Sequence, residues 1–168
     1  MIFRRTEEKD VRQVTDLWEQ ARAYFREQGI DQWQDDYPNE ESLKEDMAEG
    51  ESYILEENGK ILATAFISFR GEPDYEQIYE GDWSYKGFYG VVHRVAVDAS
   101  CKGRGLGGVL IGEAIRMCRE RQADSLRVDT HADNRSMQRM LEKNSFVRRG
   151  VIFLGRDGAR RVAFERAV

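Results

Sequence analysis

The chain is poor in cysteine, proline and histidine, with two of each among its 168 residues. Cys101 and Cys118 have no metal-ligand spacing, so we expect no metal site and two free thiols in a reducing cytoplasm. No apolar run approaches the roughly 18 residues of a membrane span, and residues 1–8 lack the apolar core of a secretory signal. The sequence therefore predicts a cytoplasmic protein that does not insert into a membrane.

The chain also lacks an excess of positive charge. It has 26 lysines and arginines against 31 acidic residues, which gives a formal net charge of −5. Nucleic-acid binding needs a basic face that neutralises phosphates, so we expect no nucleic acid as a partner. Repeats, low-complexity tracts and Pro/Ser-rich linkers are absent as well. A chain of this length can bury one sizeable core, and we expect residues 1–168 to form a single domain.

The hydrophobic pattern predicts a mixed α+β chain. Apolar residues recur at steps of three and four from residue 11 to residue 25 and predict a helix that ends before Gly29. Further helices are predicted over 40–49, around 110–118 and around 137–141, the last with Asp133 as its N-cap. Asn58 and Gly59 lie between two apolar runs and predict a β-hairpin. The predicted strands cover residues 2–5, 52–57, 60–69, 88–97, 125–130, 146–154 and 159–166.

The most informative stretch is residues 95–108, which read V-A-V-D-A-S-C-K-G-R-G-L-G-G. An apolar strand leads here through a glycine-rich loop into an amphipathic helix. Glycines let the backbone turn tightly and bring its N–H groups close to a ligand. A helix N-terminus adds unpaired donors and a partial positive charge, and Lys102 and Arg104 add full charges. The stretch predicts a site for a phosphate-bearing ligand, such as the pyrophosphate of a cofactor.

Two other phosphate-binding motifs, the dinucleotide-binding fold and the P-loop, also contain glycines at such spacings. Residues 103–108 satisfy G-x-G-x-x-G, with Asp129 at a later strand end, as in a dinucleotide-binding fold. However, residues 98–102 separate the strand from the first glycine, and the chain after Asp129 is too short for several parallel strand–helix units. A P-loop is excluded because no Lys-Ser or Lys-Thr follows the glycines. A turn whose glycines only satisfy backbone geometry remains the alternative.

Two motifs resemble the GNAT superfamily of N-acetyltransferases. Residues 102–107, K-G-R-G-L-G, resemble its acyl-coenzyme-A signature Q/R-x-x-G-x-G/A, with Lys102 in place of the usual first residue. Residues 133–150 resemble the later helix-to-strand motif, with Ser145 where glycine is usual. The resemblance implies a mixed, mostly antiparallel seven-stranded sheet flanked by about four helices, in which two adjacent parallel strands splay apart. It also implies acetyl-CoA as cosubstrate, and homodimers are frequent in the family.

The resemblance assigns cofactor contacts to these motifs. Backbone amides of residues 102–107 would contact the pyrophosphate, and edge groups of Val95 and Val97 would pair with the pantetheine amides. Asn134 would meet the cofactor arm. The expected cofactor-binding residues are Val95, Ala96, Val97, Lys102, Gly103, Arg104, Gly105, Leu106, Gly107, Gly108, Asn134 and Met137.

N-acetylation poses two proton-transfer problems. A lysine-like amine has a reference pKa near 10.4, so only about one part in a thousand is unprotonated at pH 7, and a base helps greatly. His93 lies on the strand that enters the cofactor site, and alternation places it on the same side as Val95 and Val97. A histidine hydrogen-bonded in the core is the alternative, and His131 is expected to position its loop or to contact the cofactor rather than to act as a base. In many relatives a tyrosine at the position of Leu141 protonates the leaving thiolate. Because leucine cannot donate a proton, water or another tyrosine, such as Tyr89, would have to do so here.

Two segments that combine aromatic and acidic residues, 32–37 and 74–85, suit a cationic amine through charge and cation–π attraction. The expected substrate-binding residues are Trp33, Tyr37, Tyr79, Trp83 and Tyr85, although these rings could equally pack the loops. The sequence thus predicts transfer of the acetyl group of acetyl-CoA to a primary amine of a small molecule or peptide. The alternatives are a non-catalytic acyl-CoA sensor of the same fold, and an enzyme that uses another acyl group or a hydroxyl acceptor.

Overall fold

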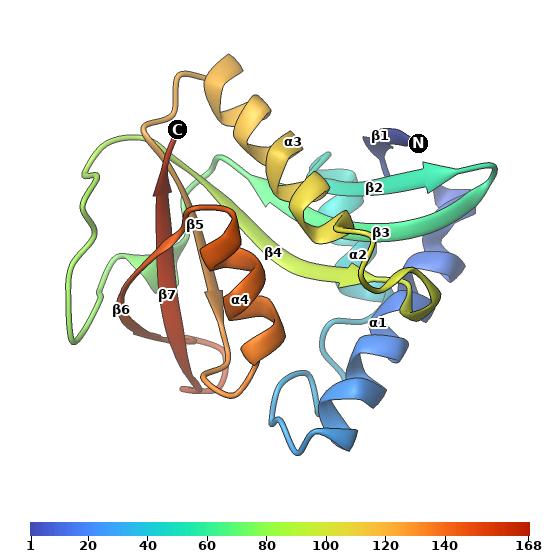
Figure 1. Ribbon diagram of the computed structural model, residues 1–168, viewed down its shortest axis with the longest axis horizontal. Helices are drawn as coiled ribbons and strands as arrows, with labels where there is room; N and C mark the ends of the chain where they lie inside the picture. The colour runs from blue at the N-terminus through green and yellow to red at the C-terminus, as the bar shows by residue number, and fades with distance from the viewer. The chain divides into compact units, whose positions relative to one another are not determined.

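The computed structural model describes residues 1–168, which form seven strands and four α-helices (Figure 1). No helix combines the length and apolar character needed to cross a membrane. The predicted element order is confirmed, and the predicted strand ends agree with the observed ones to within one residue. The strands are β1 (Ile2–Arg5), β2 (Ser52–Glu57), β3 (Lys60–Ser68), β4 (Tyr89–Val97), β5 (Ser125–Thr130), β6 (Val147–Phe153) and β7 (Arg160–Ala167). The helices are α1 (Val11–Glu27), α2 (Glu40–Ala48), α3 (Leu106–Glu120) and α4 (Arg135–Lys143).

The strands form one sheet in the order β1-β2-β3-β4-β5-β7-β6. Strands β4 and β5 are its parallel pair, and their register covers Tyr89–Val91 against Ser125–Arg127. Strand β4 continues to Val97 beyond these pairs. The predicted mixed, mostly antiparallel seven-stranded sheet with one parallel pair is therefore confirmed.

The chain divides into two compact units, each with a hydrophobic core. Unit 1 comprises Met1–Ile67 and His93–Glu113, and unit 2 comprises Ser68–Val92 and Ala114–Val168. In unit 1, the three-and-four spacing of apolar residues on α1 buries one face of that helix against α2 and the sheet. Its core contains Val11, Val14, Leu17, Trp18, Leu43, Ile54, Ile61 and Ala96. A core of unit 2 contains Tyr75, Trp83, Val91, Ile152 and Ala163.

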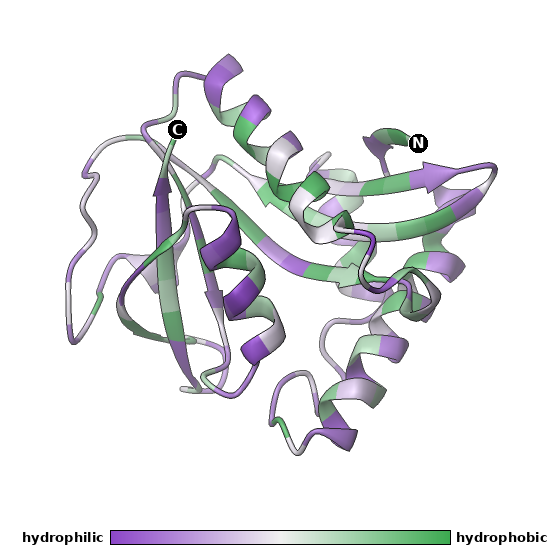
Figure 2. Ribbon diagram, in the orientation of Figure 1, coloured by the Kyte–Doolittle hydropathy of each residue, from purple (hydrophilic) through white to green (hydrophobic).

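The hairpin between β2 and β3 turns at the predicted residues. Asn58 and Gly59 both have positive φ, at 53° and 79°, as a two-residue turn between twisted antiparallel strands requires. The apolar run of β3 that follows Lys60 is mostly green in Figure 2.

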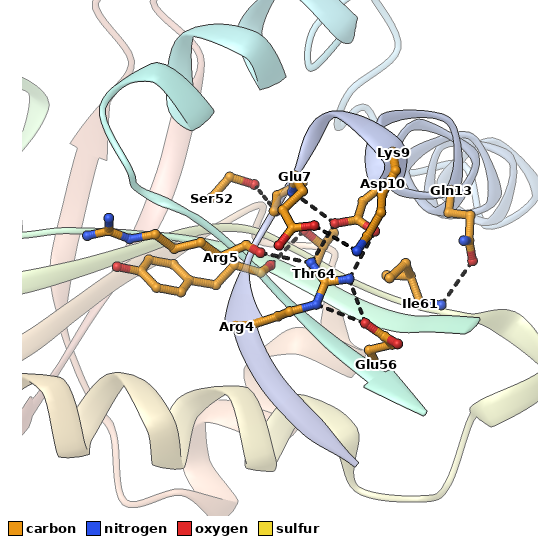
Figure 3. A network of polar contacts seen from close by, with 12 residues as sticks. Arg4, Arg5, Glu7, Lys9, Asp10, Gln13, Ser52, Glu56, Ile61 and Thr64 are labelled. Atoms are coloured by element: carbon orange, nitrogen blue, oxygen red, sulfur yellow. Dashed lines mark hydrogen bonds and ion pairs between the residues drawn. The ribbon is translucent and has the colours of Figure 1, made fainter. Parts of the chain in front are cut away.

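An ion-pair network fastens the N-terminal strand of unit 1 (Figure 3). The Arg4 guanidinium donates to both Asp10 carboxylate oxygens, at 2.6 and 3.0 Å, and to the Glu56 carboxylate at 2.5 and 2.8 Å. The Glu7 amide also donates to Asp10, at 2.8 Å. Burial by itself would raise the pKa of Asp10, but the hydrogen bonds from Arg4 and Glu7 outweigh it and lower that pKa.

This lowered pKa makes the stability of the chain depend on pH. The ionised Asp10 stabilises the fold above the carboxyl's unfolded pKa, near 3.9, and the contribution is lost as pH falls through its lower folded value. We expect Asp10→Asn to lower the free energy of unfolding by about 1–3 kcal/mol at pH 7. Urea unfolding of both proteins from pH 7 to pH 2 should show this difference shrink only below about pH 4. A difference independent of pH would contradict this role.

Candidate functional site

The glycine-rich loop lies in unit 1, between the end of β4 and the start of α3. Asp98 anchors it: its carboxylate accepts hydrogen bonds from the Ser100 amide, at 2.8 Å, and from the Ser100 hydroxyl, and it pairs with Lys60 at 3.2 Å. Gly103 and Gly105 both have positive φ, at 83° and 74°. No atom lies within 4 Å of where a Cβ would be at either glycine, so the backbone there faces open space.

The donor set of this loop suits an anion. Helix α3 begins at Leu106, and the N–H groups of Leu106, Gly107 and Gly108 belong to a first turn that has no acceptor within the helix. The helix dipole adds partial positive charge at the same end. A pyrophosphate needs several converging N–H donors on an accessible backbone, so the residues present fit this group.

The two loop cations contact other side chains of unit 1. The Lys102 ammonium lies 4.2 Å from the ring centroid of Tyr24, in cation–π contact. The Arg104 guanidinium pairs with Glu57 at 3.2 Å. Both positive charges therefore remain at the loop. When an anion binds there, Lys102 must share or give up its contact with Tyr24, and Arg104 must do the same with Glu57.

Strand β4 departs from regular alternation next to the predicted base. Arg94 has φ 52°, and the adjacent residues His93 and Arg94 both contact the Phe66 ring. The expectation that His93 lies on the same side of the strand as Val95 and Val97 therefore loses its basis, because alternation requires continuous extended backbone. His93 is half-buried, and its ring stacks on Phe66 with centroids 5.7 Å apart.

The first predicted substrate segment, residues 32–37, is held by α1. The buried Arg22 donates to the carbonyl oxygens of Trp33 and Pro38, each at 2.7 Å. The Trp33 ring packs edge-on against Phe25 at 5.5 Å. Tyr37 accepts a hydrogen bond from Arg94 at its hydroxyl. Of the predicted site residues, Tyr37 and His93 thus belong to one neighbourhood, because the Tyr37 hydroxyl contacts Arg94, the residue after His93 on β4.

The second predicted substrate segment lies in unit 2 and is anchored by a buried ion pair. Arg127 on β5 and Glu165 on β7 are paired at 2.9 Å, with side chains 5% and 0% exposed. Glu165 accepts hydrogen bonds from the amides of Ser84 and Tyr85, and Arg127 donates to the Tyr85 carbonyl. Trp83 is buried under the Arg127 guanidinium, at 4.2 Å. The segment is therefore fixed to the sheet.

Tyr79 comes earlier in the same segment and forms an isolated antiparallel bridge with Val151 on the edge strand β6. Its amide and carbonyl exchange two hydrogen bonds with Val151, both at 2.8 Å. Its ring is 43% exposed and packs against Phe153. A Cβ at Gly81 would lie 1.8 Å from the Arg149 carbonyl oxygen, so glycine is required at this crossing.

Tyr89 opens β4 in unit 2. Its hydroxyl accepts a hydrogen bond from the Glu72 amide at 3.1 Å. The Arg127 guanidinium lies over its ring, 3.9 Å from the centroid. The hydroxyl acts as an acceptor in the Glu72 bond, so that bond does not use its own proton.

The later motif forms the start of α4, with one correction. The N-cap is Asn134, whose side chain accepts from the Met137 amide at 3.2 Å; the predicted cap, Asp133, is one residue too early. Both residue types cap helices well, so the sequence alone does not separate neighbours. Asn134 is buried, Met137 half-buried and Leu141 fully buried.

His131 precedes this helix and is held in place. Its Nδ1 accepts a hydrogen bond from the Asp133 amide at 3.0 Å, and its carbonyl accepts from the Asn134 amide at 3.0 Å. An Nδ1 that accepts leaves the proton of the neutral ring on Nε2. This arrangement suits a positioning role in the loop.

Two side-chain arrangements near these residues were missed by the sequence reading. One is the Arg94–Asp46 ion pair beside His93, and the other is Arg127–Glu165. Arg94 and Arg127 are charged residues inside predicted strands. Because such a charge is rarely buried unless it is paired, each of them could have indicated that an acidic partner lies nearby.

Comparison with known proteins agrees with this geometry. A family model described as the acetyltransferase (GNAT) family matches residues 14–146, whereas no curated protein gives a significant match. A GNAT-family acetyltransferase from Streptococcus agalactiae 2603 is 29% identical, with a TM-score of 0.89 over 99% of this chain and 95% of that one. A GNAT-family acetyltransferase from Listeria monocytogenes 4b F2365 is 17% identical, with a TM-score of 0.75 over 99% and 94% of the two chains. The ribosomal-protein-alanine N-acetyltransferase from Brucella melitensis shares the fold at 16% identity, with a TM-score of 0.69 over both whole chains. Because this family model matches most of its length, the chain belongs to the GNAT family of acetyltransferases.

Proposed function

We propose that residues 1–168 act as one acyltransferase domain that moves the acetyl group of acetyl-CoA directly to a primary amine of a small molecule or peptide. The observation that carries this proposal is the loop at the end of β4, where Gly103 and Gly105 face open space and lead into the N-terminus of α3. The domain is proposed to work in the cytoplasm, where reducing conditions keep its two buried cysteines, Cys101 and Cys118, as free thiols.

In this proposal the loop and the two motifs hold the cosubstrate. Backbone amides of Gly103, Gly105 and the first turn of α3 donate to the pyrophosphate, and Lys102 and Arg104 add charge. Val95 and Val97 offer strand-edge groups to the pantetheine arm, with Ala96 buried between them. Asn134 and Met137, at the start of α4, complete the proposed cofactor-binding set.

Bound acetyl-CoA supplies a thioester, which an amine can attack only when it has lost its proton. His93 is the proposed base: it takes one proton from the attacking nitrogen and returns it to solvent. A leaving thiolate with a reference pKa near 8.5 needs little assistance. The proposed proton donor is water or the Tyr89 hydroxyl, because Leu141 is apolar and fully buried.

Aromatic residues of the two anchored segments are proposed to contact the acceptor amine. Trp33 and Tyr37 belong to the first segment, and Tyr79, Trp83 and Tyr85 belong to the second. Their rings offer cation–π contacts to an ammonium group before deprotonation. Trp83 is itself buried, whereas Trp33, Tyr37 and Tyr85 are half-buried and Tyr79 is exposed.

A thiol-release assay tests the proposal. Purified protein is incubated with acetyl-CoA and a panel that contains a polyamine, an aminoglycoside, amino acids and peptide N-termini. We expect at least one amine to accelerate coenzyme A release and to gain an acetyl group, detected by mass spectrometry. Tight acetyl-CoA binding without turnover on any amine would favour the sensor. Selectivity for a longer acyl chain, or acetylation of a hydroxyl, would favour the other alternative enzyme.

A further inference from the structure

Arg94 follows His93 directly in β4 and adopts a left-handed backbone conformation, with φ 52°. A non-glycine residue in this region is strained, and it persists only where its surroundings hold it there. The contacts of the Arg94 side chain therefore bear on the position of the residue before it.

Three elements of unit 1 converge on the Arg94 guanidinium. Asp46 on α2 accepts from Nε at 3.1 Å and from Nη2 at 2.7 Å to each of its two oxygens. The Tyr37 hydroxyl, in the first substrate segment, accepts from Nη1 at 2.5 Å. The side chains of Arg94 and Asp46 are 11% and 12% exposed. A bidentate pair at this level of burial fixes orientation more firmly than a surface ion pair does.

The same contacts reach His93. The Phe66 ring on β3 receives the Arg94 guanidinium at 4.3 Å and stacks with the His93 ring at 5.7 Å, with an interplanar angle of 18°. His93 is also close enough to Asp46 to interact with its carboxylate electrostatically. His93 and Arg94 thus share the Phe66 ring as a contact, so a movement of the Arg94 side chain disturbs the surroundings of the His93 ring.

We propose that Arg94, clamped by Asp46 and Tyr37, is a positioning residue for the acetyl-transfer reaction: it holds the left-handed turn of β4 and thereby the orientation of the His93 ring. The inference rests on the proposed function, in which His93 is the base. Since Tyr37 belongs to the first substrate segment, the clamp also ties the position of the base to that segment.

The decisive comparison is between Arg94→Gly and Arg94→Ala. Glycine adopts positive φ without strain but lacks the guanidinium, so it separates the backbone conformation from the clamp. We expect both variants, and Asp46→Asn, to lower kcat on the best amine of the panel by about tenfold to a hundredfold. The Kd for coenzyme A, measured by calorimetry, should stay within about twofold because the glycine-rich loop is untouched. Tyr37→Phe, which removes one hydroxyl, should show a smaller loss in the same direction and covers the case in which the other variants fail to fold.

A second readout does not depend on activity. The chain has two histidines, so the ring signals of His93 and His131 can be followed separately by NMR at fixed pH. In Arg94→Gly and Asp46→Asn we expect the His93 signal to shift as its stacking on Phe66 changes, while the His131 signal stays in place. Arg4→Met is the matched control, because it breaks another ion pair of unit 1 that does not contact His93.

Three outcomes would overturn the proposal. In the first, Arg94→Gly keeps wild-type kcat and the wild-type His93 signal, which means that the backbone conformation alone matters. In the second, Arg4→Met reproduces both effects, which means that general loss of stability causes them. In the third, the His93 signal is unmoved in every Arg94, Asp46 and Tyr37 variant. If the wild type acetylates no amine, the proposed function fails, whereas the NMR comparison still decides whether the clamp orients His93.

Discussion

Replacing Glu165 by alanine is expected to lower the free energy of unfolding by about 3–5 kcal/mol. Glu165 is fully buried on β7 and is paired with Arg127, itself 5% exposed. The substitution leaves the Arg127 charge buried without its partner, which costs far more than the loss of an exposed ion pair. It also removes the acceptor of the Ser84 and Tyr85 amides, so the second substrate segment loses its anchor.

Urea unfolding at pH 7 measures this loss, with Glu80→Ala as the control. Glu80 pairs with Arg160 at a similar distance, 3.0 Å, but both side chains are largely exposed. We expect the control to change the free energy of unfolding by less than about 1 kcal/mol. Equal effects of the two substitutions would show that burial of the Arg127–Glu165 pair does not determine its importance.

The second large effect concerns turnover. We expect His93→Ala to lower kcat on the best amine by about 10²–10⁴-fold, the usual contribution of a general base. A histidine base works only when it is unprotonated, so the wild-type rate should rise with pH and then level off. The variant depends on the amine losing its own proton, whose reference pKa is near 10.4, so its rate should keep rising to pH 9 and its deficit should be largest below neutral pH. Stopped reactions between pH 5.5 and pH 9 with saturating acetyl-CoA would give both profiles.

Coenzyme A affinity and His131→Ala serve as controls for this result. The His93→Ala variant should bind coenzyme A as the wild type does, because the glycine-rich loop remains intact. His131→Ala should keep the pH-dependent rise, since Nδ1 of His131 is occupied by the Asp133 amide. An unaltered pH–rate profile in His93→Ala would rule out His93 as the base.

The glycine-rich loop was predictable because its conformation depends on local chemistry. Gly103 and Gly105 have the positive φ that glycine permits, and a helix follows the loop as the pattern predicts, although it starts at Leu106, before the predicted apolar face at 110–118. The Asn58-Gly59 hairpin is predictable for the same reason. Features specified by neighbouring residues can be read from one sequence.

The clamp and the buried pair were not predictable in this way. Arg94 and Asp46 are 48 positions apart, and Arg127 and Glu165 are 38 apart, so their pairing depends on the tertiary fold. The left-handed backbone at Arg94 interrupts a run that otherwise has the pattern of a regular strand. Trp83 belongs to a segment rich in acidic residues, and nothing local indicates that its ring is buried beneath Arg127.

The way in which Arg22 holds the first substrate segment has a consequence for how this enzyme could diversify. Arg22 donates to the main-chain oxygens of Trp33 and Pro38, and those acceptors exist whatever side chains lie between them. Residues 35 and 36 can therefore change identity while the ends of the segment stay fastened, whereas the Gln34 side chain itself donates to the Arg22 and Gln32 carbonyl oxygens. In the proposed function, such an arrangement would let new acceptor preferences arise by single substitutions on an unchanged scaffold, and it marks these two positions as the natural targets for a library that seeks altered selectivity.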